Sequence, residues 1–222
     1  SAASDVYKRQ PHNHVFTISP IPRKLRFCMK FSRSALASVI TEVGSPFVLI
    51  GALLAVSAAR YEAHPWLLAS GVIFFIVVVP MVLSWWLAFS RRTTDRYIVR
   101  REQRHGFYVA SAASFLVGVA FTWFADGSWQ LRLIATYALG TLLVVAGINL
   151  KMKISVHALA AAFTAVCLPV IAGHPGWIAP AVVVALGVPW ARVYAQRHSV
   201  LEAASGFGLG LLTGSVLCGL LV

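Results

Sequence analysis

Residues 66–89 read WLLASGVIFFIVVVPMVLSWWLAF, a stretch without a single charged side chain. A helix needs roughly 20 apolar residues to cross the hydrocarbon core of a bilayer, so this stretch is long enough for one crossing. Hydrophobic residues make up 59% of the chain, against roughly 45 to 50% in soluble domains. We therefore predict an integral membrane protein.

Further apolar stretches predict an all-α fold, a polytopic transmembrane helix bundle. The expected helices are Leu36 to Ala59, Trp66 to Phe89, Phe107 to Phe124, Leu131 to Leu150, and Ser199 to Val222. No charged residue occurs from Ile154 to Ala191, and we expect Gly173-His174-Pro175-Gly176 to divide that stretch into two spans. This gives seven crossings, or six if the first segment only dips into the membrane.

The N-terminal region differs in character from the rest. Its opening, Ser1 to Gln10, reads like translated sequencing adapter, and three prolines interrupt the basic stretch that follows. We expect residues 1–28 to be a non-native or disordered segment, and residues 29–222 to form a single transmembrane domain that starts at Met29. The cysteines are odd in number and two lie in apolar spans, which predicts neither a disulfide nor a zinc site.

Basic residues exceed acidic ones by 19 to 7 and lie between the apolar spans. This position favours headgroup phosphates, a phosphorylated substrate and topology signals over a nucleic-acid partner. With loops on alternating sides, one side collects Lys30, Arg33, residues 91–104, Lys151, Lys153, Arg192 and Arg197. The other side receives Arg60 and Arg132. By the positive-inside rule the basic side is cytoplasmic, in what we expect to be a bacterial or archaeal cell membrane.

Two residue types predict how the helices are anchored and packed. The seven tryptophans all fall near predicted span ends, where amphipathic rings favour the interface. Gly206, Gly210 and Gly214 repeat every four positions, which puts them on one face of the last helix. Small residues in this pattern let two membrane helices approach closely, so we expect a packing role for them.

The cluster whose residue types most clearly indicate catalysis consists of Arg192, His198 and Glu202. On a helix, positions four apart share a face, so Glu202 can accept a hydrogen bond from one ring nitrogen of His198. That bond fixes the tautomer and makes the other nitrogen a better nucleophile. The alternative is a juxtamembrane set of positive charges with Glu202 as a structural partner.

Two more clusters fall on the same predicted side. Lys153, Ser155 and His157 precede or begin a span, where helix N–H groups attract anions and a histidine can protonate a leaving oxygen. The basic loop Asp95 to Arg104 includes Arg101 and Arg104, and arginine forks bind phosphate oxygens in pairs. A solvated loop attracted to anionic lipid is the alternative.

In order and spacing these clusters resemble the three signature motifs of the type 2 phosphatidic acid phosphatase superfamily. Its third motif has Ser-Arg, five residues, His, three residues and Asp, and this chain has Ala191-Arg192, His198 and Glu202 at that spacing. The second motif, Pro-Ser-Gly-His, keeps only its serine and histidine in Ser155-Val156-His157. In the first motif, Lys, six residues, then Arg-Pro, Arg104-His105 occupies the end and Tyr97 stands at the lysine position.

The resemblance implies a membrane phosphatase that acts on lipid or polyprenyl phosphates without a metal or other cofactor. It implies that His198 attacks phosphorus, Glu202 orients His198, and His157 protonates the leaving alcohol. Arg104, Ser155 and Arg192 would hold the phosphoryl oxygens, with Lys153 supplying the charge of the missing lysine. Arg101 is a further candidate for phosphate binding, from the basic loop and not from the motif. The alternatives are a non-catalytic lipid-binding or transport protein with an anionic headgroup pocket, and a scaffold with a degenerate site. Oligomeric state is left open.

Overall fold

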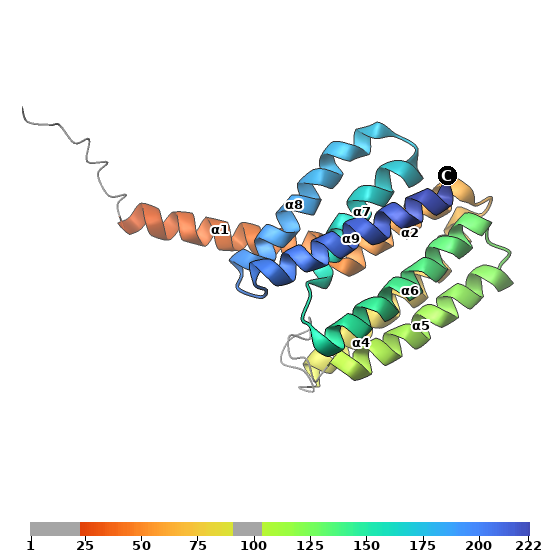
Figure 1. Ribbon diagram of the computed structural model, residues 1–222, viewed down its shortest axis with the longest axis horizontal. Helices are drawn as coiled ribbons and strands as arrows, with labels where there is room; N and C mark the ends of the chain where they lie inside the picture. Colours follow the sequence, from red (N-terminus) through yellow and green to blue (C-terminus); the bar gives the residue numbers. More distant parts are fainter. Residues whose placement is uncertain (1–22, 91–103) are drawn as a thin grey trace, which may run out of the picture. The chain divides into compact units, whose positions relative to one another are not determined.

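The computed structural model describes residues 23–90 and 104–222, with side chains from 32 to 90 and from 106 to 222. It divides into two units, Ser1–Arg33 and Ser34–Val222, and the elements from α2 onward lie in the second unit. The elements are α1 (Arg23–Val43), α2 (Pro46–Tyr61), α3 (Pro65–Ile73), η1 (Phe74–Val78), α4 (Val79–Phe89), α5 (Arg104–Phe124), α6 (Trp129–Lys151), α7 (Val156–Ala172), η3 (Pro175–Trp177), α8 (Ile178–Tyr194) and α9 (Val200–Leu221) (Figure 1).

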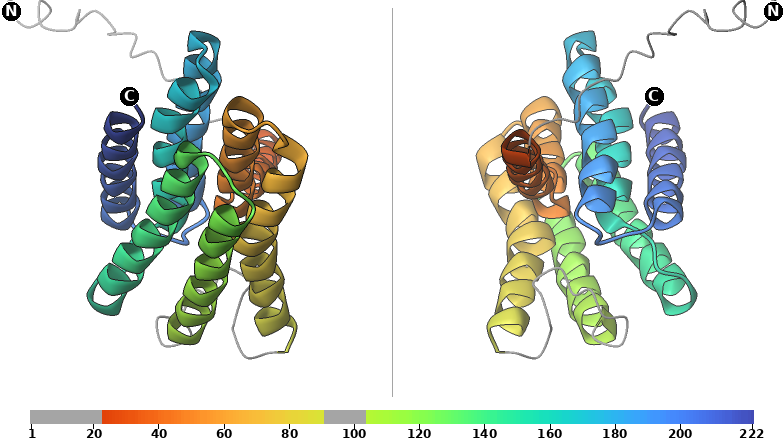
Figure 2. Two further views of the ribbon diagram at one scale, coloured as in Figure 1. Left: turned by 90° about the vertical axis from the view of Figure 1, so that its right-hand side faces the viewer. Right: turned by 90° about the vertical axis from the view of Figure 1, so that its left-hand side faces the viewer.

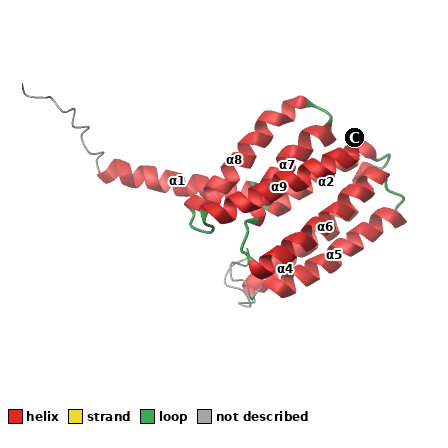
Figure 3. Cartoon of the chain, viewed as in Figure 1, coloured by secondary structure: helices red, strands yellow, loops and turns green. Residues whose placement is uncertain are grey.

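The described residues form helices and loops without a strand, which confirms the predicted all-α class (Figure 3). The expectations for residues 1–22 lie outside the described part, and the expected domain boundary after residue 28 falls inside α1. Large apolar side chains cover much of the outside, among them all seven tryptophans. A surface of this kind is suited to lipid, so the protein is an integral membrane protein.

Five helical stretches are long and apolar enough to cross a membrane. They are Pro65–Phe89, Gly106–Phe124, Trp129–Lys151, Pro175–Tyr194 and Val200–Leu221. A bent pair, Ser32–Val43 with Pro46–Tyr61, makes a sixth if it counts as one span. The predicted span from Ile154 onward is shorter than expected, because α7 has 17 residues, about 25 Å, against a hydrocarbon core of roughly 30 Å.

The first predicted helix, Leu36 to Ala59, is broken in the structure. Its two parts meet at a bend of 43°. Ser45 has an extended backbone and its hydroxyl accepts a hydrogen bond from the Val48 N–H, which is the geometry of a helix N-cap. Pro46 follows as the first residue of α2, a position where the missing N–H costs nothing. The apolar sequence pattern continues through this break. The break itself is explained by Ser45 and Pro46, which start a new helix.

The buried centre of the second unit is α7. Every residue from His157 to Thr164 is buried, because α7 contacts α2, α8 and α9. Figure 2 shows α7 beside α8 and α9, with the helices running side by side (Figure 2). A helix enclosed in this way has little contact with lipid, so α7 does not have to match the bilayer thickness.

Close packing of α7 on α9 depends on the glycines that the sequence singles out. Gly206, Gly210 and Gly214 are all buried. A Cβ on Gly206 would collide with the carbonyl oxygen of Ser155, and one on Gly210 with that of Leu159. The predicted packing role of this glycine face is therefore confirmed.

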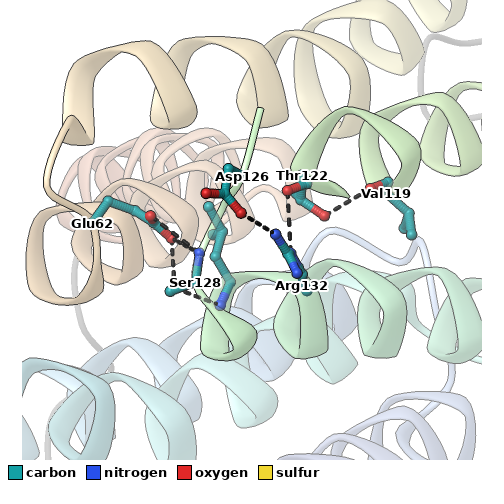
Figure 4. A network of polar contacts seen from close by, with 7 residues as sticks. Glu62, Val119, Thr122, Asp126, Ser128 and Arg132 are labelled. Atoms are coloured by element: carbon teal, nitrogen blue, oxygen red, sulfur yellow. Dashed lines mark hydrogen bonds and ion pairs between the residues drawn. The ribbon is translucent and has the colours of Figure 1, made fainter. Parts of the chain in front are cut away.

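Polar contacts join the helix ends on the side opposite the candidate site. Figure 4 shows Glu62 facing Ser128, whose N–H donates to the Glu62 carboxylate at 2.9 Å and whose hydroxyl donates at 2.5 Å (Figure 4). Arg132 pairs with Asp126 at 2.9 Å and lies 4.6 Å from the Trp123 ring centre. We call Glu62 and Ser128 the distal clamp, since they tie the α2–α3 loop to the start of α6.

Candidate active site

Two loops far apart in the sequence meet at one end of α7 and α9. The N–H of Ser155 donates to the carbonyl oxygen of Glu202 at 3.0 Å. The Lys153 ammonium donates to the carbonyl oxygen of Arg197 at 3.0 Å and lies 3.2 Å from the Glu202 carboxylate. The second and third clusters named from the sequence are therefore one site.

The turn after α8 determines where His198 lies. The carbonyl oxygen of Arg192 accepts hydrogen bonds from the N–H groups of Arg197 and His198, at 3.1 and 3.4 Å. Gln196 has a positive φ of 55°, a conformation that often ends helices. His198 thus precedes α9 and is not part of it, whereas the sequence argument placed it on the same helical face as Glu202.

Glu202 reaches back to His198 because it belongs to the cap of α9. Ser199 and Glu202 form a capping box: the Glu202 N–H donates to the Ser199 hydroxyl at 3.2 Å, and the Ser199 N–H donates to Glu202 Oε2 at 3.1 Å. The same Oε2 lies 3.0 Å from Nδ1 of His198. The predicted pair is therefore formed, through a cap geometry.

This contact assigns the tautomer of His198. An ionised carboxylate only accepts hydrogen bonds, so the proton of the neutral ring is on Nδ1 and Nε2 carries a lone pair. Burial, and then the nearby Arg192 guanidinium, lower the pKa of His198 from 6.5 to about 4, against the opposing effect of the Glu202 contact. The ring is consequently neutral and able to act as a nucleophile at neutral pH.

His198, His157 and Arg192 line one cavity of about 200 Å³. The two histidines come from different helical junctions, and His157 and Arg192 are buried, at 5% and 4% exposure. A basic residue and two histidines from separate parts of the chain therefore line the same space. Beyond them the cavity walls are mostly apolar, and include Ile50, Ile76, Phe115, Leu142 and Phe163.

Ser155 and Lys153 have different surroundings from those expected. Ser155 is the N-cap of α7: its hydroxyl accepts from the Ala158 N–H at 3.3 Å, and the residue is fully buried and does not line the cavity. Lys153 contacts Glu202 and a carbonyl oxygen. Both residues therefore hold the two loops together in this structure, and their proposed contact with phosphate stays a prediction.

Most of the first cluster, the basic loop Asp95 to Arg104, lies outside the described residues. Arg101 lies outside the described residues. Arg104 is the first residue of α5, and its side chain also lies outside the described part. Phe107 and Tyr108, in the first turns of α5, line the same cavity as His198, and the proposed phosphate contacts of Arg101 and Arg104 stay predictions.

Sequence reasoning missed two polar residues of this region. Buried Asn149 accepts from the Ile154 N–H at 3.3 Å and donates to the Val145 carbonyl oxygen at 3.0 Å, which shapes the loop that carries Lys153 and Ser155. Ser111 lines the cavity from α5 and is 1% exposed. The available signal was a polar residue inside an apolar span, which is costly in lipid and therefore informative.

Comparison of the chain with protein-family models, with curated proteins and with solved structures finds no match. The resemblance to the type 2 phosphatidic acid phosphatases therefore stays a prediction from residues and spacing. The geometry described above stands independently of that resemblance, because its distances and burial concern this chain alone.

Proposed function

We propose that this protein is a metal-independent membrane phosphatase that hydrolyses the phosphomonoester or diphosphate of a lipid or polyprenol through a phosphohistidine. The observation that carries the proposal is the orientation of His198. Its Nδ1 is held by Glu202, and its ring borders the cavity shared with His157 and Arg192. A nucleophile, an orienting base and a cation around one space satisfy the requirements of phosphoryl transfer.

The proposed reaction has two steps. Nε2 of His198 attacks phosphorus, the bond from phosphorus to the lipid oxygen breaks, and His157 donates a proton to the leaving alcohol. Water then attacks the phosphohistidine, His157 takes a proton from that water, and the N–P bond breaks to release inorganic phosphate. Throughout, the Arg192 guanidinium stabilises the charge on the phosphoryl oxygens.

The apolar part of the cavity supports a lipid as the substrate. An apolar cavity of about 150 Å³ is enough to bind benzene, so this one accommodates the first carbons of a hydrocarbon chain next to the phosphate. The membrane-embedded helices α5 and α6 supply much of its wall through Phe107, Phe115, Ala138 and Leu142. A soluble phosphate ester would leave these side chains without a partner.

The test is phosphate release by the purified protein from a panel of lipid phosphates with a metal chelator present. His198→Ala is expected to lower kcat at least about a thousandfold, because it removes the attacking atom. His174→Ala is the matched control, since the His174 side chain accepts a hydrogen bond from the nearby Gly176 N–H in the α7–α8 connection, away from the cavity lined by His198. Turnover by His198→Ala at the wild-type rate would exclude the phosphohistidine.

One observation favours a non-catalytic lipid-binding protein as the second candidate. The Lys153 ammonium is engaged by Glu202 and by a carbonyl oxygen, so in this arrangement it neutralises the carboxylate that orients His198. The phosphate-release assay distinguishes the two candidate functions. A binding protein would retain a lipid phosphate on the column or in native mass spectra and release no phosphate from any substrate in the panel.

A further inference from the structure

Two cysteines meet between α7 and α9, at the end of these helices away from the candidate active site. The Sγ atoms of Cys167 on α7 and Cys218 on α9 lie 3.8 Å apart. Both are free thiols, and the proposed reaction does not use them. Cys167 is five positions before the last residue of α7, about 7 Å along the axis, so the pair lies near the α7–α8 connection.

The register of α7 and α9 brings the two thiols together. Along the contact between the helices, each residue of α9 meets the residue of the α7 segment that precedes it by 51 positions. The pairs are Ser155 with Gly206, Leu159 with Gly210, Phe163 with Gly214, and Cys167 with Cys218. Cys218 therefore extends the glycine face by one more step of four. The sequence-based expectation of no disulfide did not include this contact, which arises from packing.

Each thiol points across the interface toward the backbone of the other helix. The Cys167 Sγ lies 3.6 Å from the carbonyl oxygen of Gly214, and the Cys218 Sγ lies 3.7 Å from that of Val166. Thiols are weak hydrogen-bond donors, so these contacts hold the side chains only weakly. A disulfide bond is about 2.05 Å long, so the two sulfur atoms have to approach by roughly 2 Å, which rotation of the two side chains can supply.

We propose that Cys167 and Cys218 form an oxidative modification site, at which hydrogen peroxide converts the two thiols into a disulfide that joins α7 to α9. Cys218 sulfur attacks the peroxide, the O–O bond breaks, and water leaves a sulfenic acid on Cys218. Cys167 sulfur then attacks the sulfenic sulfur, the S–O bond breaks, and a second water leaves. The two thiols give up two electrons and two protons, and the peroxide takes up both.

The surroundings of the pair select the oxidant. Cys167 is fully buried and packs in the apolar cluster that includes Ile171 and Leu217, whereas Cys218 is partly exposed. A small uncharged oxidant can reach such a site, and Cys218 is the thiol that it meets first. The orientation predicted from the basic loops puts this end of α7 on the outer side of the membrane, where disulfides persist once formed.

The experiment uses Cys28→Ser, which leaves only this pair of thiols in the chain. The purified protein in detergent micelles is treated with hydrogen peroxide and then denatured, and its thiols are counted with a maleimide by mass spectrometry. We expect loss of both thiols, a mass reduced by the two hydrogens, and recovery with dithiothreitol. The disulfide should lower the equilibrium constant for unfolding in SDS at least about 30-fold relative to the reduced form.

The matched control moves the second thiol to the outer face of the same helix. Val216→Cys combined with Cys218→Ser, in the Cys28→Ser background, keeps the thiol count, and Val216 is 47% exposed. Two positions apart on a helix are about 200° apart, so this variant should form no intramolecular disulfide.

Retention of both thiols in Cys28→Ser after peroxide treatment would overturn the proposal. So would oxygen addition to Cys218 without a disulfide, an equal disulfide yield in the control variant, or a disulfide that leaves SDS unfolding unchanged. These measurements involve no lipid phosphate, so their outcome is independent of the proposed phosphatase function.

Discussion

Glu202 concentrates three contacts on one carboxylate oxygen. Its Oε2 accepts from the Ser199 N–H, contacts Nδ1 of His198 and pairs with Lys153, all within 3.2 Å. The capping box starts α9 and at the same time fixes the side chain that orients His198. The start of α9 and the orientation of the His198 ring therefore depend on the same residue.

The charge of Lys153 should be visible in the pH profile. Lys153 is one of the groups that lower the pKa of His198, which is about 4. The proposed reaction requires the neutral ring, so kcat/KM, which reports the free enzyme, is expected to fall as the pH drops through about 4. Lys153→Met removes a positive charge and should raise this pKa, which moves the acid limb to higher pH.

Lys151→Met is the control for that shift, because Lys151 is an exposed lysine two positions away and is not among the groups that affect His198. An acid limb that stays in place in Lys153→Met, or moves to lower pH, would contradict the assignment. The same pKa affects stability. Because it lies below 6.5 in the folded state, the unfolded chain binds more protons between these values, and the free energy of unfolding falls as the pH is lowered from about 6.5 to 4.

Among the elements, α9 positions the site through its contact with α7. Gly206 contacts the backbone of Ser155, one turn from the Glu202 carbonyl oxygen that accepts from the Ser155 N–H. The glycine face therefore sets the spacing between the helix that carries His157 and the helix that carries Glu202.

Gly206→Ala is expected to reduce both activity and stability. The added Cβ would collide with the Ser155 carbonyl oxygen, a backbone atom that cannot move without shifting the loop. A displacement of about 1 Å at a phosphoryl-transfer site can cost about a hundredfold in rate, so we expect a loss of at least about tenfold in kcat. Phosphate release and unfolding in mixed micelles with increasing SDS measure the two effects.

Gly208→Ala separates this collision from helix propensity. Gly208 lies on the same helix and has no atom within 4 Å of an added Cβ. Alanine is favoured over glycine in a helix by up to about 1 kcal/mol, so this variant should be as stable as wild type or more so, with full activity. Equal losses in both variants would refute the packing explanation.

The helix bounds show which elements the sequence patterns predict and which they miss. Long apolar stretches predict α6 and α9 within two residues, and the glycine break after Ala172 occurs where expected, with Gly173 at a φ of 65°. The break at Ser45 was missed, because the apolar period continues through it while the cap is a local hydrogen bond. The pairing of His198 with Glu202 was predicted, although for a helical spacing that the capping box replaces.

Other features of the site have no signature in a single sequence. The contacts of Lys153 with Arg197 and Glu202 join segments 44 and 49 positions apart, and depend on how α7 packs against α9. Ser111 resembles any small polar residue of a membrane helix until the cavity beside it is known. Long-range contacts and cavities arise from packing, which composition and periodicity do not specify.

For the molecule as a whole, the distal clamp and the candidate site lie at opposite ends of the helices. Glu62→Ala removes the acceptor for both donors of Ser128, and we expect it to lower the free energy of unfolding by about 1 to 3 kcal/mol. Asp126→Ala, which breaks an exposed ion pair, should have little effect. Neither should change kcat, and an activity loss in Glu62→Ala at full stability would contradict this separation.

The orientation in the membrane is a prediction at the same scale. Lys151 lies at the end of α6 near the candidate site, and His174 lies in the α7–α8 connection at the other end. In a variant without native cysteines, Lys151→Cys should react with an impermeant maleimide only after cells are opened, whereas His174→Cys should react in intact cells. The reverse pattern would put the candidate site on the outer side.

The short length of α7 has a consequence for which phosphates can react. Gly206, which contacts the Ser155 backbone, is six positions beyond the start of α9, so Ser155 lies roughly 9 Å along the axis of α9 from that start. Under the proposed function, a lipid would have to bring its phosphate about this far along α9 to meet the imidazole of His157, which follows Ser155 in the chain. A diester such as a choline lipid would have to carry its polar substituent along the same path, so the proposed function favours lipids that end in an unsubstituted phosphate.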